Sequence, residues 1–214
     1  MRVVTVADEI YLFSTYFEPI NFTFNQFLIT GAQPLLVATG PVSVAAELLQ
    51  KVKETLGGAS LSYVFLSHFE SDECGGLSLV LEQFPKAKPL CSQTTARQLS
   101  GFGICGSSLI QAAGSSLETA DSQFSFLGYN SEMHLWEGLL LYEKRRSVLF
   151  SSDLFMQFGR PQSDVVHSTW QGQLDGLNEK TTLLPAEQLK MLVSALRPLP
   201  VALVAPGHGP CLSV

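Results

Sequence analysis

The sequence is poor in charge and has no apolar run long enough to cross a membrane. Only 15% of its 214 residues are charged, and 19 acidic against 13 basic residues give a formal net charge of -6. A chain with this balance lacks the basic patch that binds nucleic acid or an anionic membrane surface. No run approaches the roughly 18 to 20 apolar residues of a membrane span. We therefore expect small molecules or other proteins as partners, with no nucleic acid and no membrane.

Signals for export and for cysteine-based sites are also missing. Asp8 and Glu9 interrupt the apolar start of the chain, so it does not resemble a signal peptide. The cysteines at positions 74, 91, 105 and 211 show neither CxxC spacing nor the density of a disulfide framework. We expect a cytoplasmic protein with reduced thiols.

Length and hydrophobic patterning indicate one domain, residues 1–214, with 46% hydrophobic content to fill its core. Runs rich in β-branched and aromatic residues predict strands at 3–6, 10–17, 24–30, 34–38, 63–66, 88–91, 124–127, 133–136, 139–142, 148–150 and 201–205. Helical spacing predicts helices at 43–56, 77–84, 93–99 and 185–196. The stretches 101–114 and 157–182 show no clear pattern. Consecutive strands in each half favour two packed sheets with helices outside.

The segment 63–76, YVFLSHFESDECGG, is the most unusual in the chain. A buried strand ends there, and four potential metal ligands occupy the next positions: His68, Glu70, Asp72 and Glu73. Three carboxylates in one partly buried turn would repel one another unless one took up a proton or a cation bound. A solvated acidic loop is the alternative. The two glycines that follow allow backbone to pass close to a bulky centre.

Three further candidates are isolated in sequence: His134 in EMHLWEG, Asp153 in LFSSDLF and His208 in APGHGP. Each lies within or just after a short predicted strand. Ligands at separate strand ends converge when the strands share one edge of a core. By contrast, His167 lies in an irregular polar segment and is expected to be a surface or loop histidine, and Cys74 a small buried residue.

Taken together, these motifs resemble the metallo-β-lactamase superfamily, and within it the diiron domain of the flavodiiron proteins. Residues 68–73 match the HxExDH turn of that domain at three of four ligand positions, and residues 133–136, 149–153 and 206–210 are similar to its later motifs, in order. The resemblance implies an α/β fold of the α+β kind, a four-layer αββα sandwich. It also implies that one metal is held by His68, Glu70 and His134, that a second is held by Asp72 and His208, and that Asp153 bridges them.

The departure from the pattern is Glu73, where the resemblance places a histidine. If Glu73 binds, the site carries four negative side chains and balances two divalent ions in formal charge. If it turns to solvent, the second metal has few ligands. Carboxylates and imidazoles form a harder set than zinc usually prefers, which favours two iron ions, with manganese and zinc as alternatives.

The resemblance implies a protein that binds or reduces dioxygen or nitric oxide. Because the chain carries no flavodoxin-like domain, we expect no FMN site in it and electrons from a separate flavodoxin- or rubredoxin-like donor. A head-to-tail homodimer is also implied by the resemblance. Three alternatives remain: an oxygen-binding sensor, a degenerate binding domain without metal, and a metallohydrolase of esters, thioesters or phosphodiesters, in which metals lower the pKa of a bound water to about 7.

Overall fold

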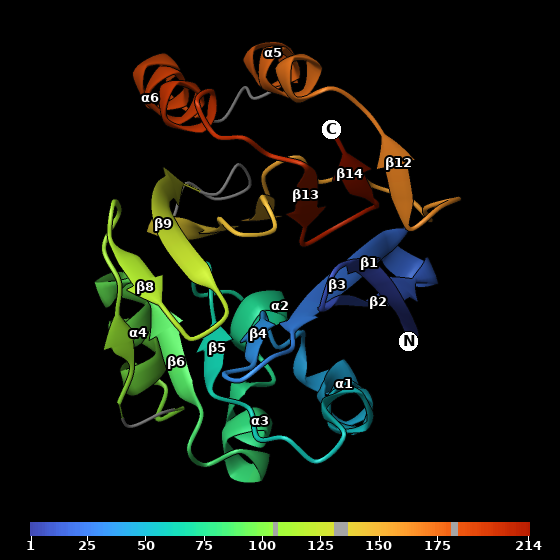
Figure 1. Cartoon of the computed structure of the whole chain (residues 1–214), viewed down its shortest axis with the longest axis vertical. Coiled ribbons are helices and arrows are strands. Elements are labelled where there is room, and N and C mark those ends of the chain that lie inside the picture. The colour runs from blue at the N-terminus through green and yellow to red at the C-terminus, as the bar shows by residue number, and fades with distance from the viewer. Residues whose placement is uncertain (105–106, 131–136, 181–183) are drawn as a thin grey trace.

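In the part of the chain that the computed structural model describes, two seven-stranded sheets pack face to face, and helices cover the outer face of each (Figure 1). The structure describes residues 1–104, 107–130, 137–180 and 184–214, with the backbone alone described at 178–180. This arrangement is the four-layer αββα sandwich that the sequence predicted. The expected strand at 133–136 and the candidate ligand His134 lie outside the described residues.

The first sheet has an antiparallel half and a parallel half. Its strands run in sequence order: β1 (Arg2–Ala7), β2 (Ile10–Phe17), β3 (Phe22–Ile29), β4 (Leu35–Val37), β5 (Tyr63–Phe65), β6 (Lys88–Cys91) and β7 (Leu109–Ile110). Strands β1 to β4 pair antiparallel, whereas β4 to β7 pair parallel and need crossovers. The crossovers are α1 (Val42–Leu56), the pair α2 (Ser71–Cys74) and α3 (Leu77–Gln83), and α4 (Gln93–Gly101).

The second sheet is assembled from the other half of the chain. Its strands lie in the order β12 (Val165–His167), β14 (Cys211–Ser213), β13 (Leu203–Pro206), β11 (Val148–Ser152), β10 (Glu137–Glu143), β9 (Gln123–Asn130) and β8 (Ser116–Glu118). Helices α5 (Trp170–Lys180) and α6 (Ala186–Leu196) cover its outer face (Figure 1). Strand β11 pairs parallel with β13, so both end at the same edge of the sheet.

Strand β10 explains why helices are needed outside the sandwich. Its residues 139–142 are all apolar, and successive side chains of a strand point to opposite faces. Leu139 and Leu141 pack between the sheets, whereas Leu140 and Tyr142 pack with α5 and α6. A strand buried on both faces therefore requires a layer on each side.

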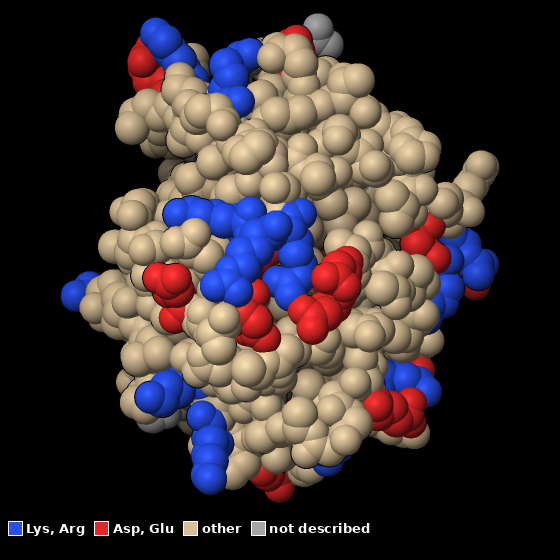
Figure 2. Space-filling model, viewed as in Figure 1, with Lys and Arg blue, Asp and Glu red and all other residues tan. Residues whose placement is uncertain are grey.

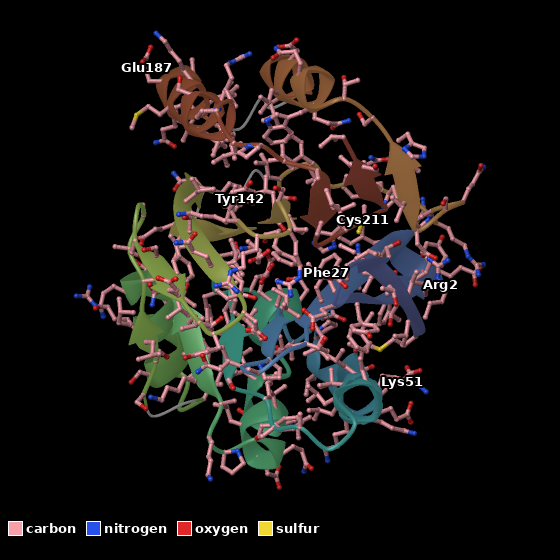
Figure 3. All side chains as sticks on the ribbon, viewed as in Figure 1. Arg2, Phe27, Lys51, Tyr142, Glu187 and Cys211 are labelled. Carbon is pink, nitrogen blue, oxygen red and sulfur yellow. The ribbon has the colours of Figure 1, made fainter. Side chains whose placement is uncertain are left out.

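The side-chain view agrees with this layering. Figure 3 places Phe27 between the sheets, in the same core cluster as Cys211, and places Lys51 and Glu187 on outer helices. Figure 2 shows acidic and basic side chains together near the middle of one face, with large uncharged areas around them. Within the described ranges, no helix combines the length and apolar character needed to cross a bilayer.

The turn after β10 ties the sheets together at the end where β11 begins. The carboxylate of Glu143 is fully buried and accepts hydrogen bonds from the backbone N–H groups of Gln123, Arg145 and Arg146. The Arg146 guanidinium also pairs with Glu9, in the turn between β1 and β2 of the first sheet. This end of the sandwich is thus closed by charged contacts, and the opposite end, where β11 finishes, carries the candidate ligands.

The structure departs from the sequence prediction in the regions without a clear pattern. Residues 157–182 contain β12 and the whole of α5, and residues 109–110 form the edge strand β7. The strand predicted at 201–205 was expected to be the last, which is wrong, because β14 follows it and pairs with β13 and β12. Such short strands depend on their neighbours in the sheet, and their own sequence carries little signal.

Candidate metal site

Candidate ligands from separate segments gather at one end of the sandwich. His68 and Glu70 follow β5, Asp72 lies in the short helix α2, Asp153 follows β11, and His208 follows β13. Strand β5 belongs to the first sheet, whereas β11 and β13 belong to the second. The site therefore forms where the ends of strands from both sheets meet, and the structure brings these five residues together.

Asp153 lies between the two histidines. Its Oδ2 atom is 3.7 Å from His68 Nε2, and its Oδ1 atom is 3.4 Å from His208 Nε2. Each histidine also has a carboxylate of its own: Glu70 Oε2 lies 3.0 Å from His68 Nε2, and Asp72 Oδ2 lies 3.1 Å from His208 Nε2. The result is two adjoining groups of donors that share one carboxylate.

Strand β3 orients the His208 loop. The Nδ1 atom of His208 donates to the carbonyl oxygen of Thr23 at 2.8 Å, which leaves Nε2 facing the carboxylates. The buried Asn25 side chain donates to the carbonyl oxygens of Pro206 and Gly209, at 3.0 and 2.7 Å. The ring of Phe22 stacks on the His208 ring with centroids 4.2 Å apart. Sequence reasoning missed these partners, because nothing in β3 itself signals a contact about 180 residues along the chain.

The residue before Asp153 has an unusual backbone conformation. Ser152 has a φ of 50°, in the left-handed region that non-glycine residues rarely adopt. Its carbonyl oxygen accepts a hydrogen bond from Gly207 N–H at 2.7 Å, which joins the ends of β11 and β13. A Cβ atom at position 207 would lie 3.3 Å from that same carbonyl oxygen, so the glycine allows the close approach. These contacts aim Asp153 into the site.

The carboxylate of Glu73 points between the sheets. The residue is 6% exposed, which rules out the alternative in which it turns to solvent. Its Oε1 atom accepts a hydrogen bond from the Ser152 hydroxyl at 2.6 Å, and its Oε2 atom accepts one from Ser67 N–H at 3.3 Å. Burial raises the pKa of Glu73 to about 7, against the opposing influence of His68.

The carboxylates of the site raise the pKa of both histidines. Burial alone would lower the pKa of His68, but the hydrogen bond to Glu70 and the charges of Glu73 and Asp153 raise it to about 9. Burial acts on His208 in the same sense, and Asp153 and Asp72 raise its pKa to about 10. Surroundings that favour positive charge on these imidazoles also favour a cation beside them.

The donor set fits a metal ion. The ligating atoms of His68, Glu70 and Asp153 all lie within 4.8 Å of one another. Asp72 Oδ1 is buried and has no hydrogen-bond partner among the residues that the structure describes. A buried oxygen without a partner is costly, and a bound cation would supply the missing partner. Carboxylate oxygens with imidazole nitrogens suit iron, manganese or zinc.

Other residues singled out from the sequence lie apart from this donor set or support it. Cys74 is buried, its thiol contacts the Glu70 carbonyl oxygen at 3.0 Å, and burial together with Glu73 raises its pKa to about 12. His167 is exposed on β12. Added Cβ atoms at Gly75 and Gly76 would meet the carbonyl oxygens of Ser71 and Thr39, so the glycines accommodate neighbouring backbone.

The glycines at 101, 103 and 106 have GxGxxG spacing, but the first of them lies at the C-terminal end of α4. A dinucleotide-binding fingerprint follows a strand and opens a helix, so this position in the fold does not suit a nucleotide cradle.

Comparisons with known proteins agree on one family. The family model described as ODP family beta lactamase matches residues 22–209. A nitric oxide reductase of Moorella thermoacetica is 27% identical over 138 residues, a match that covers 63% of this chain and 34% of that protein. The chain spans between about a third and about half of the length of the curated relatives that it matches.

Two solved structures show the same fold. The metal-soaked flavodiiron core from Synechocystis sp. has a TM-score of 0.80 at 21% identity, and the match covers 99% of this chain and 57% of that one. Rubredoxin oxygen:oxidoreductase from Desulfovibrio gigas has a TM-score of 0.76 at 16% identity, and the match covers 99% of this chain and 57% of that one.

Proposed function

The chain belongs to the ODP beta-lactamase family, and from that premise we propose that it is a non-haem diiron protein that binds or reduces dioxygen or nitric oxide. The observation that supports the proposal most strongly is the position of Asp153, whose two oxygens face different histidines. A carboxylate with one oxygen for each of two donor groups is suited to bridge two cations. The nitric oxide reductase among the relatives is consistent with this chemistry.

We assign the ligands from the two donor groups. His68 and Glu70 would hold one iron, Asp72 and His208 would hold the other, and Asp153 would be shared between them. The role of His134 as a further ligand of the first iron is carried over from the sequence resemblance alone. Manganese and zinc fit the same donors and are the alternatives that metal analysis must separate.

When bound, a diiron pair supplies electrons next to a position where a diatomic gas can bind. The side chains of this protein orient the donors for it. The Thr23 carbonyl oxygen accepts the hydrogen bond from His208 Nδ1–H, so in the neutral ring Nε2 has the lone pair that can bind a metal. The stacked ring of Phe22 shields one face of His208 from water. No side-chain nucleophile is needed.

Repeated turnover requires electrons from outside the site. We propose that a separate flavodoxin- or rubredoxin-like protein donates these electrons, in line with the sequence expectation. We also propose that the protein forms a head-to-tail homodimer. We further propose that residues 1–214 act as one metallo-β-lactamase-like unit in the cytoplasm. These proposals concern the whole assembly, and the iron site itself does not depend on them.

The test is gas consumption by protein reconstituted with Fe(II) under anaerobic conditions. Reduced flavodoxin or rubredoxin is supplied as donor, and dioxygen or nitric oxide is followed at an electrode. We expect consumption that depends on iron and on donor. Protein that consumes neither gas, but hydrolyses a thioester or a nitrocefin-like compound when loaded with zinc, would instead favour the metallohydrolase. Protein that takes up no metal would favour a binding domain.

A further inference from the structure

The side chain of Glu73 contacts the strand ends that carry two of the candidate ligands. Both oxygens of its carboxylate accept hydrogen bonds, one from the Ser152 hydroxyl at 2.6 Å and one from Ser67 N–H at 3.3 Å. The two donors come from different sheets, because Ser67 follows β5 and Ser152 ends β11. Each donor is also the residue directly before a candidate ligand, His68 in one case and Asp153 in the other.

The backbone of Glu73 is anchored to a third strand end. Its carbonyl oxygen accepts hydrogen bonds from Thr39 N–H at 2.8 Å and from the Thr39 hydroxyl at 3.1 Å. Thr39 follows β4, whose neighbour in the sheet is β5. Three strand ends that border the site therefore meet at one residue, which fixes the place of its carboxylate.

The Ser152 hydroxyl connects Glu73 to a histidine. It donates its hydrogen to Glu73, and its oxygen lies 3.5 Å from His68 Nδ1, which is also 3.4 Å from the Ser67 hydroxyl oxygen. A histidine that binds a metal through Nε2 commonly donates its Nδ1–H to a fixed acceptor, which sets the orientation of the ring. With its own proton directed at Glu73, the Ser152 oxygen presents lone pairs toward that Nδ1–H.

Among the residues that the structure describes, the closely spaced donor atoms do not include those of Glu73. The group of closely spaced ligating atoms comprises His68, Glu70 and Asp153, and the second histidine has Asp72 as its own carboxylate. Glu73 is instead paired with two hydrogen-bond donors inside the sandwich. A buried carboxylate is retained at little cost only when such donors are present.

Resting on the diiron function proposed above, we propose that Glu73 is a positioning residue that sets the geometry of His68 and Asp153 and does not bind metal. By holding Ser67 and Ser152, it fixes the two backbone segments that carry these ligands across the gap between the sheets. The glutamate at this position then replaces a ligand of the family pattern with an internal anchor.

The experiment measures Fe(II) affinity by anaerobic calorimetry, with Mn(II) binding followed by electron paramagnetic resonance as a second readout. Glu73→Ala removes both acceptors, and we expect affinity to fall by about 10- to 100-fold, as for other residues that orient metal ligands. Ser152→Ala should also lower the Fe(II) affinity. In the double variant, the fold-loss of affinity should be smaller than the product of the two single losses, because both changes break the same contact.

Glu73→Gln separates an anchor from a ligand. The amide oxygen can accept from Ser67 N–H, and the amide nitrogen can donate to the Ser152 oxygen, so both segments stay in place without the charge. We expect the Fe(II) affinity of this variant to lie within about threefold of that of the native protein and its Mn(II) spectrum to be unchanged, because the contacts with Ser67 and Ser152 are preserved.

The matched control is Glu143→Gln together with Glu143→Ala. Glu143 is also a buried carboxylate that accepts backbone N–H groups, but it lies at the other end of β10 and β11. These variants should lower the free energy of unfolding and leave Fe(II) affinity unchanged. Far-ultraviolet circular dichroism verifies that each variant is folded.

The outcomes are distinct. Equal loss of affinity in Glu73→Gln and Glu73→Ala would identify the carboxylate as a ligand and overturn the inference while leaving the diiron function intact. Unchanged affinity in Glu73→Ala and Ser152→Ala would overturn it as well. Native protein that binds neither Fe(II) nor Mn(II) would remove the proposed function, and the inference with it.

Discussion

His208 donates its Nδ1–H to the carbonyl oxygen of Thr23, 2.8 Å away and 185 residues earlier in the chain. A carbonyl oxygen only accepts, so in the neutral ring, the form that binds a metal, this contact keeps the proton on Nδ1. The other nitrogen, Nε2, then faces Asp72 and Asp153 as an acceptor for a cation. The first strands of the chain thus determine how a distant histidine is presented.

Asn25 gives the first prediction, because its amide holds the loop on both sides of His208. Asn25→Ala leaves the carbonyl oxygens of Pro206 and Gly209 without this donor. We expect a loss of about 1–3 kcal/mol in the free energy of unfolding and a fall in Fe(II) affinity of about 10- to 100-fold. Urea denaturation and calorimetry measure the two effects. Native affinity in the variant would mean that the loop is positioned by other contacts.

Gly138 gives a second prediction. A Cβ atom at this position would lie 3.3 Å from His68 Cβ and 3.3 Å from the Ser67 carbonyl oxygen. Gly138→Ala should therefore displace His68, cost about 1–3 kcal/mol of stability and weaken Fe(II) binding. Gly176→Ala is the matched control, since an added Cβ there meets nothing within 4 Å. Position 176 lies inside α5, so that change should stabilise the protein by about 0.5–1 kcal/mol. Equal affinities in the two variants would contradict the prediction.

The third prediction concerns pH and protein stripped of metal with a chelator. The pKa values of His68 and His208 are raised to about 9 and about 10. Their charged forms therefore add stability that is full below the ordinary histidine pKa of about 6.5 and is lost as pH rises through the folded-state values. The Glu73 pKa, raised to about 7, changes stability in the same direction at lower pH. We expect the melting temperature of stripped protein to fall steadily from pH 6.5 to pH 10.

Metal-loaded protein is the comparison for that experiment. A bound cation requires neutral imidazoles, so the histidines no longer gain protons on folding, and the melting temperature should change much less over the same range. Parallel curves for stripped and loaded protein would show that the histidines are not the groups responsible.

Much of the fold was predictable because its strands are strongly patterned. The run 139–142 is apolar on both faces, and residues 68–73 concentrate ligand types directly after a buried strand. The separate positions of Asp153 and His208 were also found, because each follows a short apolar segment. These features are local in sequence, which is why they could be recognised without coordinates.

The rest of the site depends on contacts between distant segments. The direction of Glu73 is set by Ser152, 79 residues further along, and a glutamate in a turn gives no local sign of such a partner. Asn25 is polar within a strand, yet it is 3% exposed, because its side chain donates hydrogen bonds to the loop that follows β13 of the other sheet. Strand β14 has three residues, and only its pairing with β12 and β13 defines it.

Asp153→Asn addresses the shared carboxylate. Asparagine keeps the volume of the side chain but loses its charge and replaces one oxygen with an amide nitrogen. We expect bound iron to fall from about two ions per chain to one or none, since a carboxylate no longer joins the two donor groups. Asp8→Asn, which changes an exposed carboxylate in the turn after β1, should keep the native iron content. Retention of native iron content by Asp153→Asn would contradict a bridging role.

The most direct measurement is the metal content and Mössbauer spectrum of native protein purified without oxygen and loaded with isotopically enriched iron. We expect about two irons per chain in a spin-coupled pair. One isolated iron, preferential retention of zinc, or no bound metal would rule out the diiron site.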